Sequence, residues 1–330
     1  MRNYKIDNIR FILILLVVLG HFLEPSQSTS LMYGAELIYS FHMPVFVFIS
    51  GYLAKFNTQR IVRTYLYSYV LLQAIYIFFN KFYLDKPDTS LDFSNPHHSL
   101  WYLLAMAMYC MIIPLIETER TSKKLVVFAL SLFVSLFAGT DWGLDETFTL
   151  GRFFGFLPFF VLGYYLQGVS FGERIKKWSL SLKILFTAFL GFIIAFAEFF
   201  IVKTPHITIL DMYFSHPYYQ TSGGAFARLM LLAVGFLWIG FLFMITPKKP
   251  LPIISKIGEN TFPVYIFHGI IIKILLKHGL ICLDARTYAL VAVAISLALV
   301  LLLGNKTASA VAKWGFTGHW IGVVGKKIKK

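Results

Sequence analysis

Residues 7–52 contain the two apolar stretches that decide the fold, DNIRFILILLVVLGH at 7–21 and FHMPVFVFISGY at 41–52. Arg10, His21 and His42 interrupt these runs of hydrocarbon side chains. An arginine inside a membrane costs roughly 2.5–3.5 kcal/mol on insertion scales, so ionisable residues kept there usually serve a function. The three residues therefore mark a candidate site within a membrane protein.

The spacing of Arg10 and His21 places them on one face of a helix. They are eleven residues apart, which at about 100° per residue is about 20° more than three full turns, with a rise of about 16 Å. We expect the guanidinium near one membrane surface and the imidazole deeper inside. Asp7 precedes Arg10 by three residues on the same face, and we expect these two side chains to pair.

Composition places the chain among polytopic helical membrane proteins. Of its 330 residues, 58% are hydrophobic and 18% aromatic, and the mean hydropathy is +0.70. Soluble domains are markedly less apolar. The net charge of +14 indicates basic cytoplasmic loops rather than nucleic-acid binding. The two cysteines predict neither a disulfide framework nor a zinc site.

We expect an all-α bundle of about ten transmembrane helices in a single domain. The expected spans are 8–24, 33–54, 61–80, 98–116, 124–139, 150–168, 181–202, 225–246, 260–277 and 287–304. A basic tail at 305–330 follows, and its lysines are expected to meet anionic lipid headgroups. With the N-terminus in the cytoplasm, 22 of the 30 lysines and arginines lie on the cytoplasmic side and five outside. This bias predicts that both termini are cytoplasmic.

Two groups of residues indicate possible catalytic and phosphate-binding roles. The neutral imidazole of His21 is a suitable general base near neutral pH, although a histidine can also serve only to hold two helices together. Arg60 and Arg63, in RIVR, face the same way and match the geometry of phosphates. Their alternative role is the ordinary positive flank of a membrane span.

Other polar and aromatic residues are expected to line a path through the bundle. These candidate pocket residues are His42, Trp101, Tyr102, Arg152, Arg228 and His268. The buried histidines have no i,i+4 spacing and no deep carboxylate beside them, so we expect no metal or haem site. His97 and His98 are expected to be loop residues that line a vestibule rather than ligands. The aromatic loop 203–224 is read equally as a sugar-binding surface or an interfacial belt.

Six segments together resemble the membrane-bound acyltransferase-3 family, which includes polysaccharide O-acetyltransferases and fucose-acetylase-like proteins. Each is a weak pattern alone, but their order and topology match those of the family. The six segments are IDNIRFILILLVVLGH, FHMPVFVFISGYL, RIVR, SLWYLLAMAMY, GRFFGFLPFFVLGYYL and IGENTFPVYIFHG.

The resemblance implies transfer of an acyl group, usually acetyl, from cytosolic acyl-CoA to a hydroxyl of an extracytoplasmic or lipid-linked glycan. His21 would be the catalytic histidine with Arg10 as its partner, and Arg60 and Arg63 would hold the donor's phosphates. Acetyl-CoA would be a substrate, and no bound cofactor is expected. The setting would be a bacterial plasma membrane.

Two points stay open at the level of sequence. Some family members carry a fused esterase-like domain that these 330 residues do not contain. Transfer would then be direct, would use a separate extracytoplasmic partner protein, or would act on a lipid-linked glycan. A transporter or flippase is the alternative function, since it would use the same buried polar path.

Overall fold

The computed structural model describes residues 2–26, 28–138, 147–169, 179–203 and 224–318, and all regular structure in these ranges is helical. The first half contains α1 (Tyr4–Leu23), α2 (Thr29–Tyr52), α3 (Thr58–Arg60), η1 (Ile61–Leu66), α4 (Tyr67–Phe78), η2 (Phe79–Tyr83), η3 (His98–Leu100), α5 (Trp101–Ile116) and α6 (Thr121–Phe137). The second half contains η4 (Thr147–Thr149), α7 (Leu150–Tyr165), α9 (Leu180–Lys203), α11 (Gly224–Ile245), α12 (Pro252–Glu259), α13 (Phe262–Lys277), η6 (Leu280–Cys282), α14 (Ala285–Leu303) and α15 (Lys306–Phe316).

The structure confirms an all-helical membrane fold. Among the described residues, seven helices are long and apolar enough to cross a membrane, or eight if α12 and α13, which meet at an 81° bend, form one span. Each of the ten expected segments coincides with a helix. The α6 helix, with 17 residues, is short for a span, whereas α9 has 24 residues. The helix count of the described residues is thus roughly that of the expected polytopic bundle.

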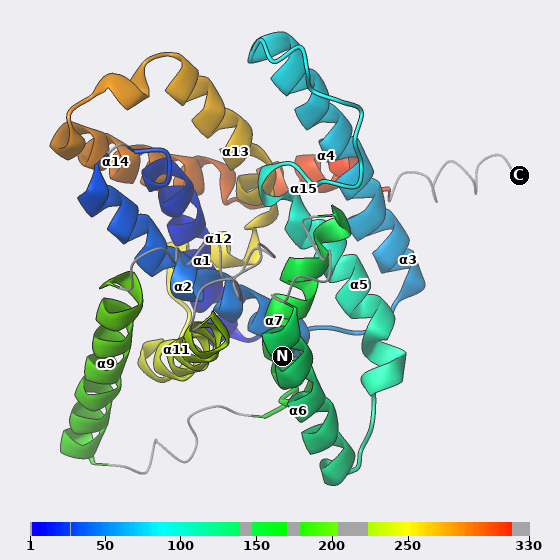
Figure 1. Cartoon of the computed structure of the whole chain (residues 1–330), viewed down its shortest axis with the longest axis vertical. Helices are drawn as coiled ribbons and strands as arrows, with labels where there is room; N and C mark the ends of the chain where they lie inside the picture. Colours follow the sequence, from blue (N-terminus) through cyan, green and yellow to red (C-terminus); the bar gives the residue numbers. More distant parts are fainter. Residues whose placement is uncertain (1, 27, 139–146, 170–178, 204–223, 319–330) are drawn as a thin grey trace, which may run out of the picture.

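Helices α1 and α2 lie at the centre of the bundle (Figure 1). Helix α1 packs against α2, α12, α13 and α14, while α2 packs against α7 and α11. The N-terminal turn of α1 is anchored by Asn8, whose side-chain amide donates to the carbonyls of Pro247 and Lys249. Ser255 in turn donates to the Asn8 side-chain oxygen. The central helix is thereby fixed to the loop and helix that follow α11.

Glycines allow α2 and α7 to approach closely. A Cβ atom added at Gly51 would lie 2.2 Å from the carbonyl oxygen of Phe160, and one added at Gly163 would lie 2.1 Å from that of Phe48. Small residues at such crossings are the usual means of tight helix association in membranes. The side chain of Gln167 also donates to the carbonyls of Gly51 and Ala54 just beyond α7.

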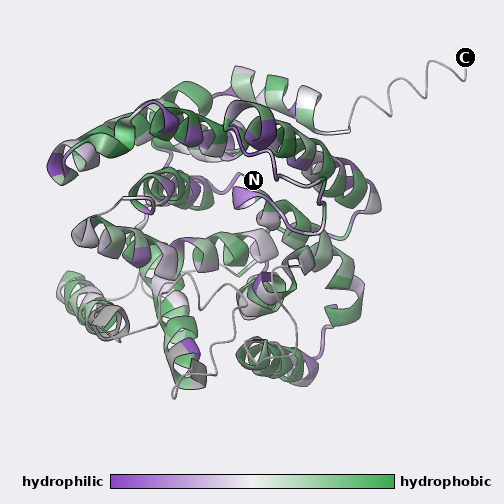
Figure 2. Cartoon of the chain, turned by 45° about the horizontal axis from the view of Figure 1, so that its top comes forward, coloured by the Kyte–Doolittle hydropathy of each residue, from purple (hydrophilic) through white to green (hydrophobic). Residues whose placement is uncertain are grey.

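Large apolar side chains remain exposed on the outer helices, as expected for surfaces that face lipid. Hydrophobic residues dominate most of the helices (Figure 2). On α9 and α14 the exposed side chains include Leu185, Phe192, Leu290 and Leu302. The expected basic tail is partly folded, because α15 follows α14 and packs against α4 and α13.

Candidate active site

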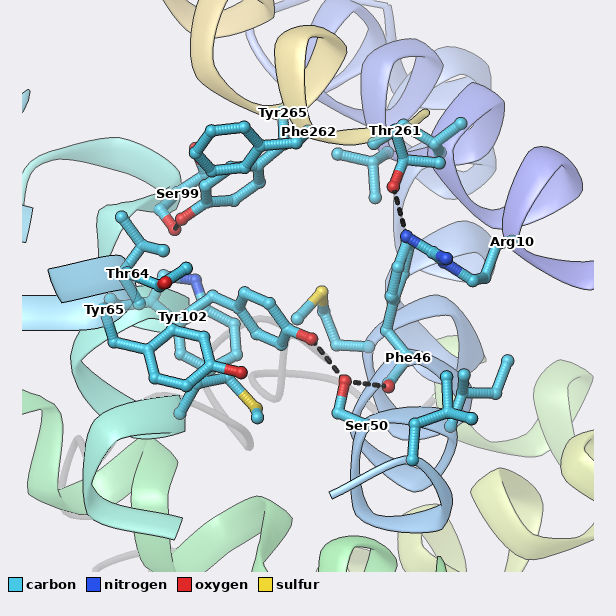
Figure 3. A pocket seen from close by; sticks show the side chains of 18 of the residues that line it. Arg10, Phe46, Ser50, Thr64, Tyr65, Ser99, Tyr102, Thr261, Phe262 and Tyr265 are labelled. Atoms are coloured by element: carbon cyan, nitrogen blue, oxygen red, sulfur yellow. Dashed lines mark hydrogen bonds between the residues drawn. The ribbon is translucent and has the colours of Figure 1, made fainter. Parts of the chain in front are cut away.

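A cavity of about 910 Å³ runs along α1 and α2. Its other walls are formed by α5, the continuous helical segment from α3 to η2 (residues 58–83), α7, the start of α13, and α15. Figure 3 shows part of it, with Arg10 facing Tyr102 and Ser50 across the opening. The two ends differ in chemistry. We call the end lined by Arg60, Arg63 and Lys313 the basic end, and the end lined by His21 and Glu24 the histidine end.

At the histidine end, His21 is held by Tyr39 and Glu24. The Nδ1 atom of His21 lies 2.9 Å from the Tyr39 hydroxyl and 3.3 Å from Oε2 of Glu24. The Tyr39 hydroxyl donates to the same carboxylate oxygen at 2.7 Å. We therefore assign the proton of the neutral imidazole to Nδ1, which leaves the lone pair of Nε2 available to accept a proton.

His21 lies near the end of α1 rather than in the middle of a span, but other rings enclose it. Its ring centroid is 4.3 Å from that of His98 and 5.4 Å from that of His268. The His98 and His268 centroids are 5.4 Å apart. We call these three residues the histidine cluster. They come from α1, η3 and α13, so no local spacing in the sequence relates them.

A network of hydrogen bonds positions His98. The buried Gln73 amide donates to the carbonyls of Asp92 and Asn95, and its oxygen accepts from the backbone N–H of His97. Hydrogen bonds from Ser94 and Asn95 lower the pKa of Asp92 and keep this carboxylate ionised within the same loop. His98 itself adopts a φ of 52°, in the left-handed region that non-glycine residues rarely occupy.

Arg10 lines the same cavity, but its partners differ from those expected. Its guanidinium donates to the hydroxyl of Thr261, at the bend between α12 and α13, at 2.9 Å. The expected pairing with Asp7 is corrected: Asp7 accepts from Arg2 at 2.7 Å, and Asp7 is not a lining residue. Arg2 also pairs with Glu259 at 2.9 Å. Asp7 therefore has a structural position at the end of α1.

The basic end is built on an irregular helix. Arg60 ends α3 and Arg63 lies within η1, a π-helical turn; such turns are frequent at functional sites. The guanidinium of Arg60 lies 5.6 Å from the centre of the Tyr65 ring. The backbone carbonyl of Arg63 accepts from Gly318, which brings the end of α15, and with it Lys313, to the same part of the cavity.

The remaining expected pocket residues divide into two groups. His42, Trp101, Tyr102 and Arg152 line the cavity, whereas Arg228 and His268 do not. The Arg152 guanidinium lies 5.3 Å from the centre of the Trp101 ring. Arg228 is buried in α11 away from the cavity, and His268 lies behind its wall within the histidine cluster. Most of the aromatic loop expected at 203–224 lies outside the described residues.

Sequence reasoning missed three lining residues of the site, Glu24, Tyr39 and Lys313. Glu24 lies three residues after His21, a spacing that brings side chains together on a helix, so this signal was available. Tyr39 and Lys313 gave no signal of their own. His98 was expected to line a vestibule and does line the cavity, but its contacts with His21 and His268 were not expected, because sequence does not indicate which helices a loop folds against.

These observations define a polytopic helical membrane protein with one cavity joining a cationic end to a histidine–carboxylate pair. The family described as an acyltransferase domain, Acyl_transf_3, matches residues 3–305. The chain therefore belongs to the acyltransferase-3 family and is a membrane acyltransferase. Searches among curated proteins and among solved structures gave no match.

Proposed function

We propose that this protein is a transmembrane O-acyltransferase, most simply an O-acetyltransferase, acting in a bacterial plasma membrane with both termini in the cytoplasm. Acyl-CoA would enter at the basic end and a glycan hydroxyl at the histidine end. The observation that carries the proposal is a cavity with arginine and lysine side chains at one end and an oriented imidazole at the other. The acceptor would be a cell-surface or lipid-linked glycan.

The donor fits the basic end through its charge. Coenzyme A carries several phosphate charges and cannot cross a bilayer, whereas its pantetheine arm is narrow enough to follow a cavity. Arg60 and Arg63 can each bind phosphate oxygens in bidentate fashion. Arg10 would meet the arm further along the cavity, where its guanidinium already has a hydroxyl partner in Thr261.

His21 would then act as general base. Its Nε2 takes the proton from the acceptor hydroxyl as the hydroxyl oxygen attacks the thioester carbonyl. Collapse of the tetrahedral intermediate breaks the C–S bond, and the proton on Nε2 passes to the departing thiolate. Glu24 and Tyr39 hold the ring in the tautomer that this step needs, as the carboxylate does in a Ser-His-Asp triad. A covalent acyl-enzyme would need a second transfer but would use the same groups.

The first test is binding of acetyl-CoA to the purified protein in detergent, measured by calorimetry. We expect saturable binding that Arg63→Ala weakens by roughly 10–150-fold, because a hydrogen bond to a charged group contributes about 1.5–3 kcal/mol. Arg120→Ala is the matched control, since Arg120 is exposed beside α6 and outside the cavity. Equal weakening by both variants, or no binding by a folded protein, would refute the donor site.

A second measurement addresses the base. His21→Ala should give a folded, membrane-inserted protein that binds acetyl-CoA but transfers no acyl group. Full activity in this variant would show that His21 is not the base.

A further inference from the structure

Buried polar atoms in and around the histidine cluster lack hydrogen-bond partners among the described residues, and the proposed acyl transfer does not account for them. Four buried atoms in this region have no hydrogen-bond partner among the described residues: Nε2 of His98, Nε2 of His268, the hydroxyl of Tyr76 and Oγ of Ser99. Buried polar atoms without partners are rare in native proteins, and an ion or a water molecule usually explains them. The general base needs only His21, so the two other imidazoles call for a separate explanation.

Ring nitrogens of the three histidines lie close to one another. One ring nitrogen of each of His21, His98 and His268 lies within 4.8 Å of the corresponding nitrogens of the other two. Tetrahedral zinc with Zn–N bonds of about 2.0–2.1 Å needs nitrogens roughly 3.3 Å apart. Metal binding would require the rings to rotate about their side-chain bonds until these separations shorten by up to about 1.5 Å.

Hydrogen bonds fix the tautomers of two of the rings, so that each presents a nitrogen lone pair to a metal ion. His268 is wholly buried, and its Nδ1 lies 2.9 Å from the carbonyl oxygen of Val264. That carbonyl can only accept, so Nδ1 carries the proton and Nε2 presents a lone pair. His21 is held in the same tautomer by Glu24 and Tyr39. Histidine ligands of metals typically donate their second N–H to a carboxylate or a backbone carbonyl, which are the partners found here.

Nε2 of His98 is a third buried ring nitrogen without a partner, beside the lone pairs of His21 and His268. A water molecule has two protons and can donate to at most two of these nitrogens, whereas a transition-metal ion binds three neutral imidazoles at once. Sites with three protein ligands and one open position are typical of zinc enzymes. The open position would face the cavity, because His21 and His98 line it and His268 lies behind them.

We infer that His21, His98 and His268 form a binding site for one divalent transition-metal ion, and that a metal bound there stops acyl transfer. The metal would form a coordinate bond with the lone pair of His21 Nε2, so this nitrogen could no longer accept a proton from the acceptor. The effect on activity rests on the proposed function, whereas metal binding does not. Protons would compete with the metal for the same nitrogens, so binding would weaken in acid.

Packing around His98 gives a second way to disturb the site. A Cβ atom added at Gly269 would lie 2.2 Å from Cδ2 and 2.6 Å from Nε2 of His98, and 2.3 Å from the Tyr76 hydroxyl. Gly269→Ala should therefore displace the His98 ring while all three histidines remain in the chain.

The test is a titration of purified, chelator-treated protein in detergent with Co²⁺, followed by the visible absorption of cobalt bound to nitrogen ligands. We expect one Co²⁺ per chain, displaced by Zn²⁺. His98→Gln, His268→Gln and Gly269→Ala should each weaken binding, the two ligand variants by more than the roughly 10–100-fold typical of losing an outer partner. His278→Gln is the matched control, because His278 is a histidine bonded to Tyr83 at an exposed position outside the cluster. Size-exclusion profiles and melting curves identify any variant that fails to fold.

Zinc sensitivity is then measured as the transfer rate with Zn²⁺ divided by the zinc-free rate of the same variant. Inhibition in wild type and in His278→Gln, but not in His268→Gln, would support the proposal. Absence of Co²⁺ binding, or binding unaffected by the cluster variants, would overturn the site. Activity lost on chelation and restored by zinc would overturn the inhibitory role. A wild-type protein that binds Co²⁺ but transfers no acyl group would refute only the proposed function.

Discussion

Glu24→Gln tests whether a carboxylate is needed behind the catalytic imidazole. The substitution keeps the size of the side chain and its ability to accept from Tyr39, but it removes the negative charge 3.3 Å from His21 Nδ1. In the proposed transfer step the imidazole of His21 becomes positively charged, and Glu24 would stabilise that charge. The variant should fold normally, because the side chain lies at the end of α1 and is 43% exposed.

The size of the effect follows from the contact. A hydrogen bond between charged partners contributes about 1.5–3 kcal/mol, and about 1.36 kcal/mol corresponds to a tenfold change in rate. Partial exposure of Glu24 screens the charge, so the lower part of this range applies. We expect kcat to fall roughly 10–30-fold, with the KM for acetyl-CoA unchanged.

The assay is release of the CoA thiol from acetyl-CoA by membranes that contain the native acceptor, normalised to the amount of protein. Glu119→Gln is the control, because Glu119 is fully exposed and its contact with Lys124 is long, at 3.9 Å. A wild-type kcat in Glu24→Gln would refute the role of the carboxylate. A rise in KM with kcat unchanged would place Glu24 in substrate binding instead.

Two further predictions concern binding and stability. Lys313→Ala should raise the KM for acetyl-CoA roughly 1.4–5-fold with kcat unchanged, because one exposed ion pair contributes about 0.2–1 kcal/mol. Lys306→Ala, on the same helix but not lining the cavity, should have no effect, and equal KM values in the two variants would exclude a donor contact. Gly163→Ala should destabilise the protein by about 1–3 kcal/mol, which would be seen as a lower melting temperature in detergent. Gly191→Ala is the control, since a Cβ atom there meets nothing within 4 Å. Equal melting temperatures of the two variants would show that the α2–α7 contact is looser than described.

Periodicity and composition predicted much of the fold and part of the site. The eleven-residue spacing of Arg10 and His21 is a property of one helix, and one helix carries both into the cavity. The predicted pairing of Asp7 with Arg10 was wrong because Arg2, just before α1, pairs with the Asp7 carboxylate at 2.7 Å. Helical spacing alone does not account for such a competitor.

Contacts between distant segments were beyond prediction from one sequence. His98 meets His21 and His268 only because a loop held by Gln73 folds back over the bundle. The expectation of no metal site was based on the spacing of ligands along a single helix. That criterion does not apply to a cluster whose histidines come from three helices. The 81° bend between α12 and α13 was not predicted, since the expected span at 260–277 begins only after α12.

The close contact of α2 with α7 has a consequence for how the protein is made. About 100 residues separate the end of α2 from the start of α7, and synthesis at about 5–20 residues per second takes about 5–20 s to cover them. During that interval α2 is in the membrane without α7, whose close approach Gly51 allows. Chains halted before α7 should therefore remain open to membrane proteases, and arrival of α7 should be the step that protects them.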